Sequence, residues 1–235
     1  MSSSYEIAVG VPVVHEEVSA AVHRPDDVDA TTPVVVLGHG VTNDRHHPLI
    51  ASTLERLAYR GVAGVRFNFP FKERGDETPD GGEVLADTIT AVVQMVHERF
   101  LGDPPVILGG KSLGARLAAA HQRDHRIAVG MLYLGFPLHA PDDKSNLRGE
   151  DLTQIQVPQL CLQGDRDPFC DLNLLEKVHG AMDSPWHLEI FEGGHGLGLG
   201  NGPVDEAGEA LLDRIADLTA AWIRDQILVR GSERA

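Results

Sequence analysis

Apolar runs of strand length alternate with helical patterns along almost the whole chain, and this alternation limits the possible folds more than any other feature. Strands that alternate with helices build a mostly parallel sheet with helices on both faces. The first 25 residues predict one or two strands at an edge of that sheet, as an antiparallel hairpin if there are two. The periodicity predicts strands at 33–40, 62–69, 104–110, 127–137, 157–165 and 185–193, and helices at 49–61, 82–100, 113–122, 171–182 and 203–227.

The 235 residues are enough for one large α/β domain with a sizeable core. No internal repeat, low-complexity linker or compositional break divides the chain. We therefore expect a single domain over residues 1–235, with a frayed tail at 229–235.

Charge and composition exclude several classes of partner. The formal net charge of −15 repels nucleic-acid phosphates and anionic lipids, so we expect neither nucleic acid nor membrane as a partner. No secretory signal pattern opens the chain, and no apolar run has transmembrane length. Cys161 and Cys170 imply no disulfide framework, which is typical of a cytoplasmic protein. Nothing in the sequence indicates the oligomeric state.

The stretch VILGGKSLGARLAAA (106–120) fits two motifs, and its context decides between them. A P-loop, G-x-x-x-x-G-K-[ST], requires a glycine where this chain has Pro105, and residues 106–108 belong to the predicted strand. The nucleophile elbow, G-x-S-x-G, instead requires a strand before it and a helix after it, as found here. Gly110 and Gly114 stand where the tight turn leaves no room for a β-carbon. Ser112 is therefore the candidate nucleophile, and we expect Lys111 to point outward.

A nucleophilic serine needs a base, and the base needs an acid that orients it. In this motif's usual setting the chain order is serine, acid, histidine, each beyond the end of a strand. Asp167 follows the strand at 157–165 and is the preferred acid, with Asp165 as the alternative. His195 stands in a glycine-rich loop after the last strand and is the candidate base. Each aspartate also has a simpler interpretation, as a surface loop residue.

The oxyanion hole should combine the amide of Leu113 with that of Val41, or alternatively of Thr42, in the glycine-containing loop after the strand at 33–40. Bracing of this loop is the simpler role for His39, and packing is the simpler role for Phe71. We expect no metal or cofactor, since His121 and His125 lack a convincingly spaced third ligand. The candidate substrate contacts are His39, Gly40, Thr42, Asn68, Phe71, Pro137 and His139.

Six segments carry a family resemblance: LGHG (37–40), RFNFPF (66–71), GGKSLGARLA (109–118), LGFPLHAP (134–141), QGDRDPF (163–169) and GGHGL (193–197). Along nearly its whole length the chain resembles the α/β-hydrolase superfamily. It looks most like the small dienelactone-hydrolase-like group, which also includes a testis-expressed vertebrate protein and a subunit of a histone-acetylating complex. Some relatives serve as complex subunits, and dienelactone hydrolases proper carry cysteine at the elbow, so lactone chemistry is not inherited.

The resemblance implies that Ser112, Asp167 and His195 act as nucleophile, acid and base. Only about 20 residues connect the strand at 127–137 to the next predicted element, and this connection is too short for a large cap domain. We expect a serine hydrolase that cleaves an ester, thioester or related acyl bond of a small molecule through an acyl-enzyme on Ser112. The alternatives are a non-catalytic interaction module with the same fold, and a hydrolase of lactones or carbon–carbon bonds.

Overall fold

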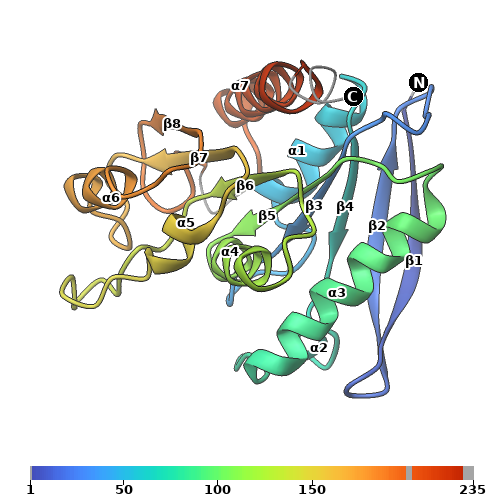
Figure 1. Cartoon of the computed structure of the whole chain (residues 1–235), viewed down its shortest axis with the longest axis horizontal. Coiled ribbons are helices and arrows are strands. Elements are labelled where there is room, and N and C mark those ends of the chain that lie inside the picture. The colour runs from blue at the N-terminus through green and yellow to red at the C-terminus, as the bar shows by residue number, and fades with distance from the viewer. Residues whose placement is uncertain (1, 200–202, 230–235) are drawn as a thin grey trace.

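A computed structural model describes residues 2–199 and 203–229. One sheet runs through the molecule in the strand order β1-β2-β4-β3-β5-β6-β7-β8 (Figure 1). β1 pairs antiparallel with β2 and β2 with β4, and all the other neighbours are parallel. The strands are β1 (Ser3–Val11), β2 (Glu16–Arg24), β3 (Val34–Gly38), β4 (Ala63–Phe67), β5 (Val106–Lys111), β6 (Gly130–Leu134), β7 (Gln159–Gly164) and β8 (Trp186–Phe191).

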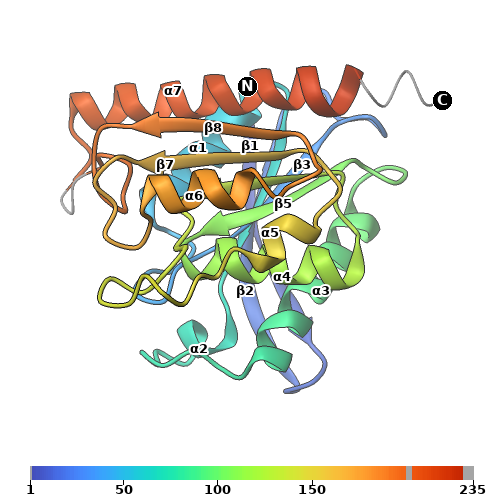
Figure 2. The ribbon, with the colours of Figure 1, turned by 60° about the vertical axis from the view of Figure 1, so that its left-hand side comes forward.

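Helices cover both faces of the sheet (Figures 1 and 2). α1 and α7 pack together on one face, while α3, α4, α5 and α6 lie on the other. The helices are α1 (Pro48–Ala58), α2 (Pro70–Glu73), α3 (Gly82–Arg99), α4 (Leu113–His125), α5 (Glu150–Gln154), α6 (Leu172–His179) and α7 (Glu206–Ile223), and a π-helix, η1 (Arg224–Leu228), continues α7. Among these described elements none forms a cap domain over the sheet.

The expected α/β-hydrolase architecture is confirmed, including the edge hairpin formed by β1 and β2. Two short helices, α2 and α5, were not predicted, because four or five residues are too few to show a helical period. α4 runs three residues past its predicted end, to His125. Of the tail predicted to fray, Val229 still caps η1, and residues 230–235 lie outside the described part of the chain.

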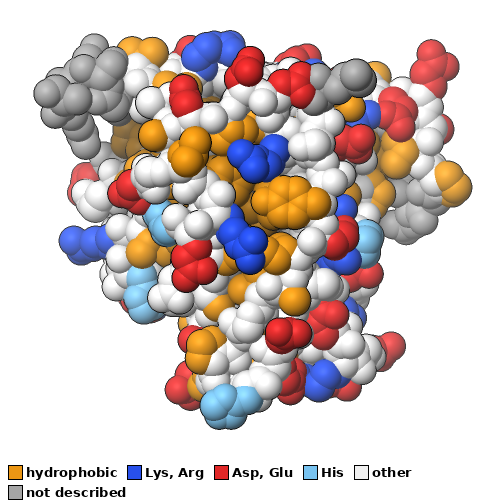
Figure 3. Space-filling view, turned by 90° about the vertical axis from the view of Figure 1, so that its right-hand side faces the viewer, with side chains coloured by type: hydrophobic (Ala, Val, Ile, Leu, Met, Phe, Trp, Pro, Cys, Tyr) orange, Lys and Arg blue, Asp and Glu red, His pale blue; other side chains and the backbone are white. Residues whose placement is uncertain are grey.

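The β1 end of the sheet is an open edge, seen face-on in Figure 3. Hydrophobic side chains on this face are surrounded by acidic and basic ones. Tyr5 is among the exposed hydrophobics, whereas Glu6 pairs with Arg45 at 2.7 Å. Charges around an edge strand discourage pairing with another chain. Within the described ranges no helix is both long enough and apolar enough to cross a membrane.

Two hydrophobic cores sandwich the sheet, one under α3 and α4 and the other under α1 and α7. β3, β5, β6, β7 and β8 run parallel, so their carboxyl ends meet at one edge. In open α/β sheets this edge is where ligands bind. The loops that follow these strands carry all three candidate triad residues.

Candidate active site

Ser112 occupies a strained turn between β5 and α4. Its φ of 55° and ψ of −115° lie in a region that residues with a β-carbon rarely adopt. A β-carbon added to Gly110 would lie 2.5 Å from the carbonyl oxygen of Gly38, and one added to Gly114 would lie 2.3 Å from the same oxygen. The elbow therefore packs against the end of β3, and only glycine fits two residues before and two residues after the serine.

His195 and Asp167 form the second part of the site. His195 Nδ1 lies 2.7 Å from Asp167 Oδ2, and the aspartate side chain is completely buried. An ionised carboxylate can only accept, so Nδ1 carries the proton and Nε2 presents its lone pair. Nε2 is itself buried and has no hydrogen-bond partner among the described residues. The pair thus leaves one basic nitrogen unused.

Other groups fix the Asp167 carboxylate. Gln163 Nε2 donates to Oδ2 at 2.6 Å, and the Phe169 amide donates to Oδ1 at 2.8 Å. Gln163 Oε1 in turn accepts from the Phe136 amide at 2.9 Å. The sequence reading missed Gln163, although a glutamine inside the apolar run of β7 was the signal that could have revealed it.

Asp165, the alternative acid, has a different role. Its Oδ1 accepts from the Gly193 amide at 2.8 Å, and its own amide donates to the Phe191 carbonyl at 2.9 Å. It therefore ties the end of β8 to β7 and fixes the start of the loop that carries His195. The structure gives the imidazole contact to Asp167.

Strand register connects the imidazole to the elbow. Lys111 pairs with Leu134 across β5 and β6, so Ser112 and Gly135 follow at neighbouring positions. A β-carbon added to Gly135 would lie 3.4 Å from His195 Nδ1. Gly135 also has a φ of 71°, a conformation that favours glycine. The absence of a side chain here leaves room for the imidazole beside the serine.

The two predicted oxyanion donors, the backbone amides of Val41 and Leu113, are free to bind an oxyanion. In the described chain neither the Val41 nor the Leu113 amide donates a hydrogen bond to another residue. Leu113 is the first residue of α4, where helix geometry leaves the amide without an intrahelical acceptor. His39 Nδ1 lies 2.8 Å from the Gly40 carbonyl oxygen, and His39 Nε2 accepts from the Phe69 amide at 3.0 Å. Burial lowers the pKa of His39 to about 4, so the ring is neutral at pH 7.

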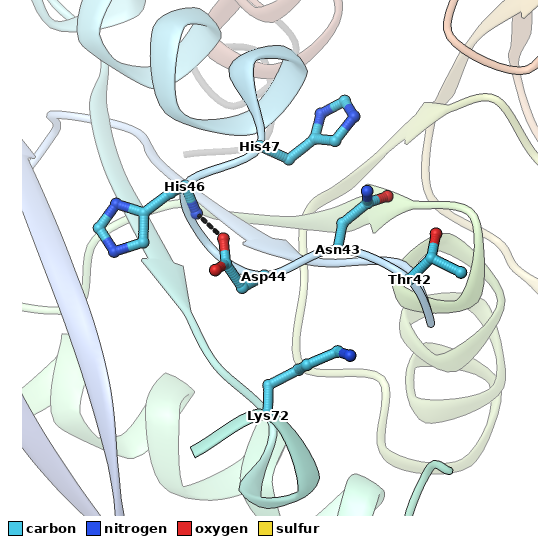
Figure 4. A pocket seen from close by; sticks show the side chains of 6 residues that line it. All are labelled: Thr42, Asn43, Asp44, His46, His47 and Lys72. Atoms are coloured by element: carbon cyan, nitrogen blue, oxygen red, sulfur yellow. Dashed lines mark hydrogen bonds between the residues drawn. The ribbon is translucent and has the colours of Figure 1, made fainter. Parts of the chain in front are cut away.

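A polar cavity of about 340 Å³ opens beside this loop (Figure 4). Its lining residues come from the segment before α1 and from α2: Thr42, Asn43, Asp44, His46, His47 and Lys72. Of the seven predicted substrate contacts, Thr42 alone belongs to this lining. The other six are buried: His39, Gly40, Asn68, Phe71, Pro137 and His139.

Those buried positions hold the loops in place. Asn68 Oδ1 accepts from the Arg45 amide at 2.9 Å, and Phe71 packs near the His39 ring at 5.5 Å between centroids. His139 Nδ1 lies 2.8 Å from the Ala140 carbonyl oxygen, and its Nε2 accepts from the Asp171 amide at 2.9 Å. In this structure Asn68, Phe71 and His139 hold loops in place, and their contact with substrate stays a prediction.

Lys111 differs from expectation, because its side chain is buried and only 6% of the residue is exposed. Strand alternation explains this: Lys111 faces the same side of β5 as Ile107, toward the layer of α1 and α7. Burial lowers the pKa of its ammonium, and the negative charge of Asp167 opposes the shift. A buried cation thus lies directly before the serine.

The remaining nucleophile and ligand candidates do not form a second centre. Burial raises the pKa of the Cys170 thiol to about 12, so it is protonated and a poor nucleophile at pH 7. The His121 and His125 rings lie 4.3 Å apart on α4, and burial lowers the pKa of His121 to about 4. In the residues that the structure describes, no cluster of three or more His, Cys, Asp or Glu side chains is arranged to hold a metal ion.

An elbow serine, a histidine–aspartate pair and two free amides at the carboxyl edge of a parallel sheet define a hydrolase of the α/β type. Residues 31–224 match the family described as "Alpha/beta hydrolase domain", and the chain belongs to this family.

Solved structures share the whole architecture. An α/β serine hydrolase homologue from Coxiella burnetii superimposes with a TM-score of 0.71 at 18% identity, covering 91% of this chain and 96% of that one. Dienelactone hydrolase from Anabaena variabilis gives 0.72 at 18% identity, over 96% and 98%. A serine hydrolase without lid from Xanthomonas campestris gives 0.70 at 19% identity, over 94% and 95%. At these identities the likeness shows the fold.

A curated protein from Syntrophotalea carbinolica, named DNA-directed RNA polymerase subunit beta, is 26% identical over 172 residues. The match covers 70% of this chain but only 12% of that protein. The polymerase name therefore describes a far longer chain and carries nothing about the activity of this one.

Proposed function

We propose that the protein is a serine hydrolase that cleaves carboxylic esters, thioesters or related acyl bonds of small molecules through an acyl-enzyme on Ser112. The observation that carries the proposal is the His195–Asp167 pair. The pair is held at 2.7 Å on a fully buried carboxylate, and its second ring nitrogen is unpaired. A base held in this way, beside an elbow serine, has the arrangement that nucleophilic acyl transfer requires.

The steps follow from these groups. His195 Nε2 takes the proton from Ser112 Oγ as the oxygen attacks the substrate carbonyl, through a hydrogen bond that forms when substrate binds. Asp167 holds the imidazole and stabilises the imidazolium that forms. The amides of Val41 and Leu113 stabilise the oxyanion. His195 then protonates the leaving group and, in the second half, activates the water that hydrolyses the acyl-enzyme.

The rival functions make different demands on the chain. A protein that only binds partners has no need for a buried carboxylate hydrogen-bonded to a histidine at the carboxyl ends of the strands. It also has no need for a serine with a strained backbone. Hydrolysis of lactones or carbon–carbon bonds would use the same three residues, so substrate trials separate it from esterase activity. Serine at the elbow, where dienelactone hydrolases carry cysteine, favours ester chemistry.

A fluorophosphonate probe tests the proposal directly, because it labels only an activated serine. The wild type, Ser112→Ala and the exposed control Ser145→Ala are treated with the probe and assayed on p-nitrophenyl acetate. We expect labelling and turnover in the wild type and the control, and neither in Ser112→Ala. A folded wild type that neither labels nor turns over would favour the interaction module.

A further inference from the structure

The polar cavity lies next to the elbow serine. A β-carbon added to Gly40 would lie 3.2 Å from Ser112 Cβ and 3.3 Å from Asn43 Oδ1, so Asn43 and the serine flank the same glycine. On the other side, the charges of Lys111 and His195 add to the lowering of the His47 pKa, which is caused mainly by burial. The cavity therefore lies within reach of one end of a substrate whose carbonyl binds at Ser112.

Every side chain that lines the cavity can form hydrogen bonds. Figure 4 shows the side chains of Asn43 and His47 on one side of the segment 42–47 and that of Lys72 on the other. His47 Nδ1 accepts from the Leu49 amide at 3.2 Å, which leaves the proton on Nε2. The cavity thus offers donors and acceptors together, and no aliphatic side chain belongs to its lining.

The charges in the cavity offset each other. Lys72 is positive and Asp44 negative, and burial lowers the pKa of His47 to about 4, so His47 is neutral at pH 7. The whole chain carries a net charge of −15, which disfavours the approach of anions. A neutral group with hydroxyl or ether oxygens suits such a lining better than a carboxylate or a phosphate.

An apolar groove lies at the opposite end of the strands. A groove of about 780 Å³ is lined by residues that precede the parallel strands, among them Pro105, Val129, Pro158 and Pro185, and by Ile227 and Leu228. These residues are at the amino ends of the strands, opposite the elbow. At roughly 3.3 Å per residue, the six-residue strand β5 separates the two ends by about 20 Å of packed core. An alkyl chain on a substrate bound at Ser112 cannot use this groove.

We propose that the substrate of this hydrolase carries a neutral, oxygen-rich group, such as a hydroxylated acyl or alcohol moiety, which binds in the cavity formed by Thr42, Asn43, Asp44, His46, His47 and Lys72. The proposal rests on the serine-hydrolase function proposed above. It assigns the substrate class of that site and excludes long-chain lipid esters.

Matched ester pairs provide the test. 2-Methoxyethyl acetate and butyl acetate differ by one ether oxygen in the alcohol, and p-nitrophenyl methoxyacetate and butyrate differ in the same way in the acyl group. Each kcat/KM ratio is divided by the ratio of alkaline hydrolysis rates, which removes intrinsic reactivity. We expect a corrected preference of roughly tenfold or more for the oxygen-bearing member of at least one pair. The pair that shows it identifies which end of the substrate fills the cavity.

Variants link that preference to the cavity. Asn43→Leu should bring the ratio close to one, whereas Asn173→Leu, an exposed position on α6, should leave it unchanged. A corrected preference for the butyl or longer alkyl esters would overturn the proposal. A stronger preference for a hemisuccinate ester over the neutral ethers would overturn the assignment to neutral groups. Wild-type labelling by the fluorophosphonate in these cases would show that the hydrolase function stands and that only the substrate class is wrong.

Discussion

His39 and His139 stand on either side of the elbow, in the loops after β3 and β6, the two neighbours of β5. Each ring lies 2.8 Å from the carbonyl oxygen of its own next residue through Nδ1, and each accepts from a distant amide through Nε2. The hydrogen-bonding device is the same in the two loops. The sequence analysis named both rings as candidate substrate contacts, with bracing of the loop as the simpler role for His39, and the structure shows both rings buried.

The difference lies in the peptide that each ring fixes. In a trans peptide the C=O and the following N–H point in opposite directions. When His39 binds the Gly40 carbonyl, it therefore fixes the direction of the Val41 amide, the proposed oxyanion donor. When His139 binds the Ala140 carbonyl, the next residue is Pro141, which has no N–H to present. The first loop can take part in the chemistry, and the second can only hold the acid loop through Asp171.

The acid itself should show the largest effect. Asp167→Asn removes the charge that orients His195 and stabilises its protonated form, so we expect kcat to fall by roughly 10⁴. Steady-state kinetics on p-nitrophenyl acetate measure this, with Asp142→Asn on an exposed loop as the matched control. A loss of less than tenfold would mean that another carboxylate serves the histidine, and Asp165 would be tested next.

Substitution of His39, which positions the proposed oxyanion donor, should cause the second-largest loss of kcat. His39→Leu removes the shorter of two hydrogen bonds to the Gly40 carbonyl and leaves only the one from the Asn43 amide at 3.4 Å, so the Val41 amide is held less firmly. Removal of one oxyanion donor costs roughly 10²–10³ in kcat, which sets the upper limit of the expected loss. KM should change little, since the ring does not touch substrate. The exposed His187→Leu serves as control, and an unchanged kcat would show that the His39 ring does not direct the Val41 amide.

His139→Leu should affect stability more than turnover. The substitution leaves the Asp171 amide without its acceptor, which costs about 1–3 kcal/mol of the free energy of unfolding. Asp167 keeps its contacts with Gln163 and the Phe169 amide, so kcat should stay within roughly tenfold of the wild type. Urea denaturation and kinetics on the same sample measure the two quantities. A loss of kcat as large as that of His39→Leu would remove the distinction between the loops.

Titration of His39 should affect stability alone. Its pKa falls from 6.5 in the unfolded chain to about 4 in the fold because the ring is buried. Between these values the unfolded chain binds the extra proton, so the free energy of unfolding decreases as pH falls from 6.5 to 4, by up to about 1.4 kcal/mol per pH unit. His23, His47 and His121 add the same sign. Denaturation across this window should show a shallower slope for His39→Leu, and equal slopes would contradict a buried neutral ring.

The features that could be predicted from the sequence are those that depend on a periodic pattern or on a motif. Alternating strand and helix patterns predicted the sheet, and the elbow glycines predicted the turn at Ser112. Chain order selected Asp167 and His195, which the structure brings to 2.7 Å. The direction of side chains in the loops was not predictable, because it depends on contacts across the sheet. Two strand residues were also misjudged: Lys111 was expected outside and Gln163 was overlooked, because their burial depends on which layer of helices covers each face of the strand.

The segment 68–82 contains α2 and contributes Lys72 to the wall of the polar cavity, and its anchoring has a consequence for how substrates enter. Phe69 and Phe71 are completely buried, and Asp80 accepts from the Phe71 amide at 2.8 Å while also pairing with Arg74 at 2.5 Å. Swinging this segment outward would expose two phenylalanines, at about 1.5–3 kcal/mol each. A segment anchored in this way does not act as a lid, so we expect no interfacial activation. Turnover should therefore rise smoothly with dissolved ester and show no jump when droplets begin to form.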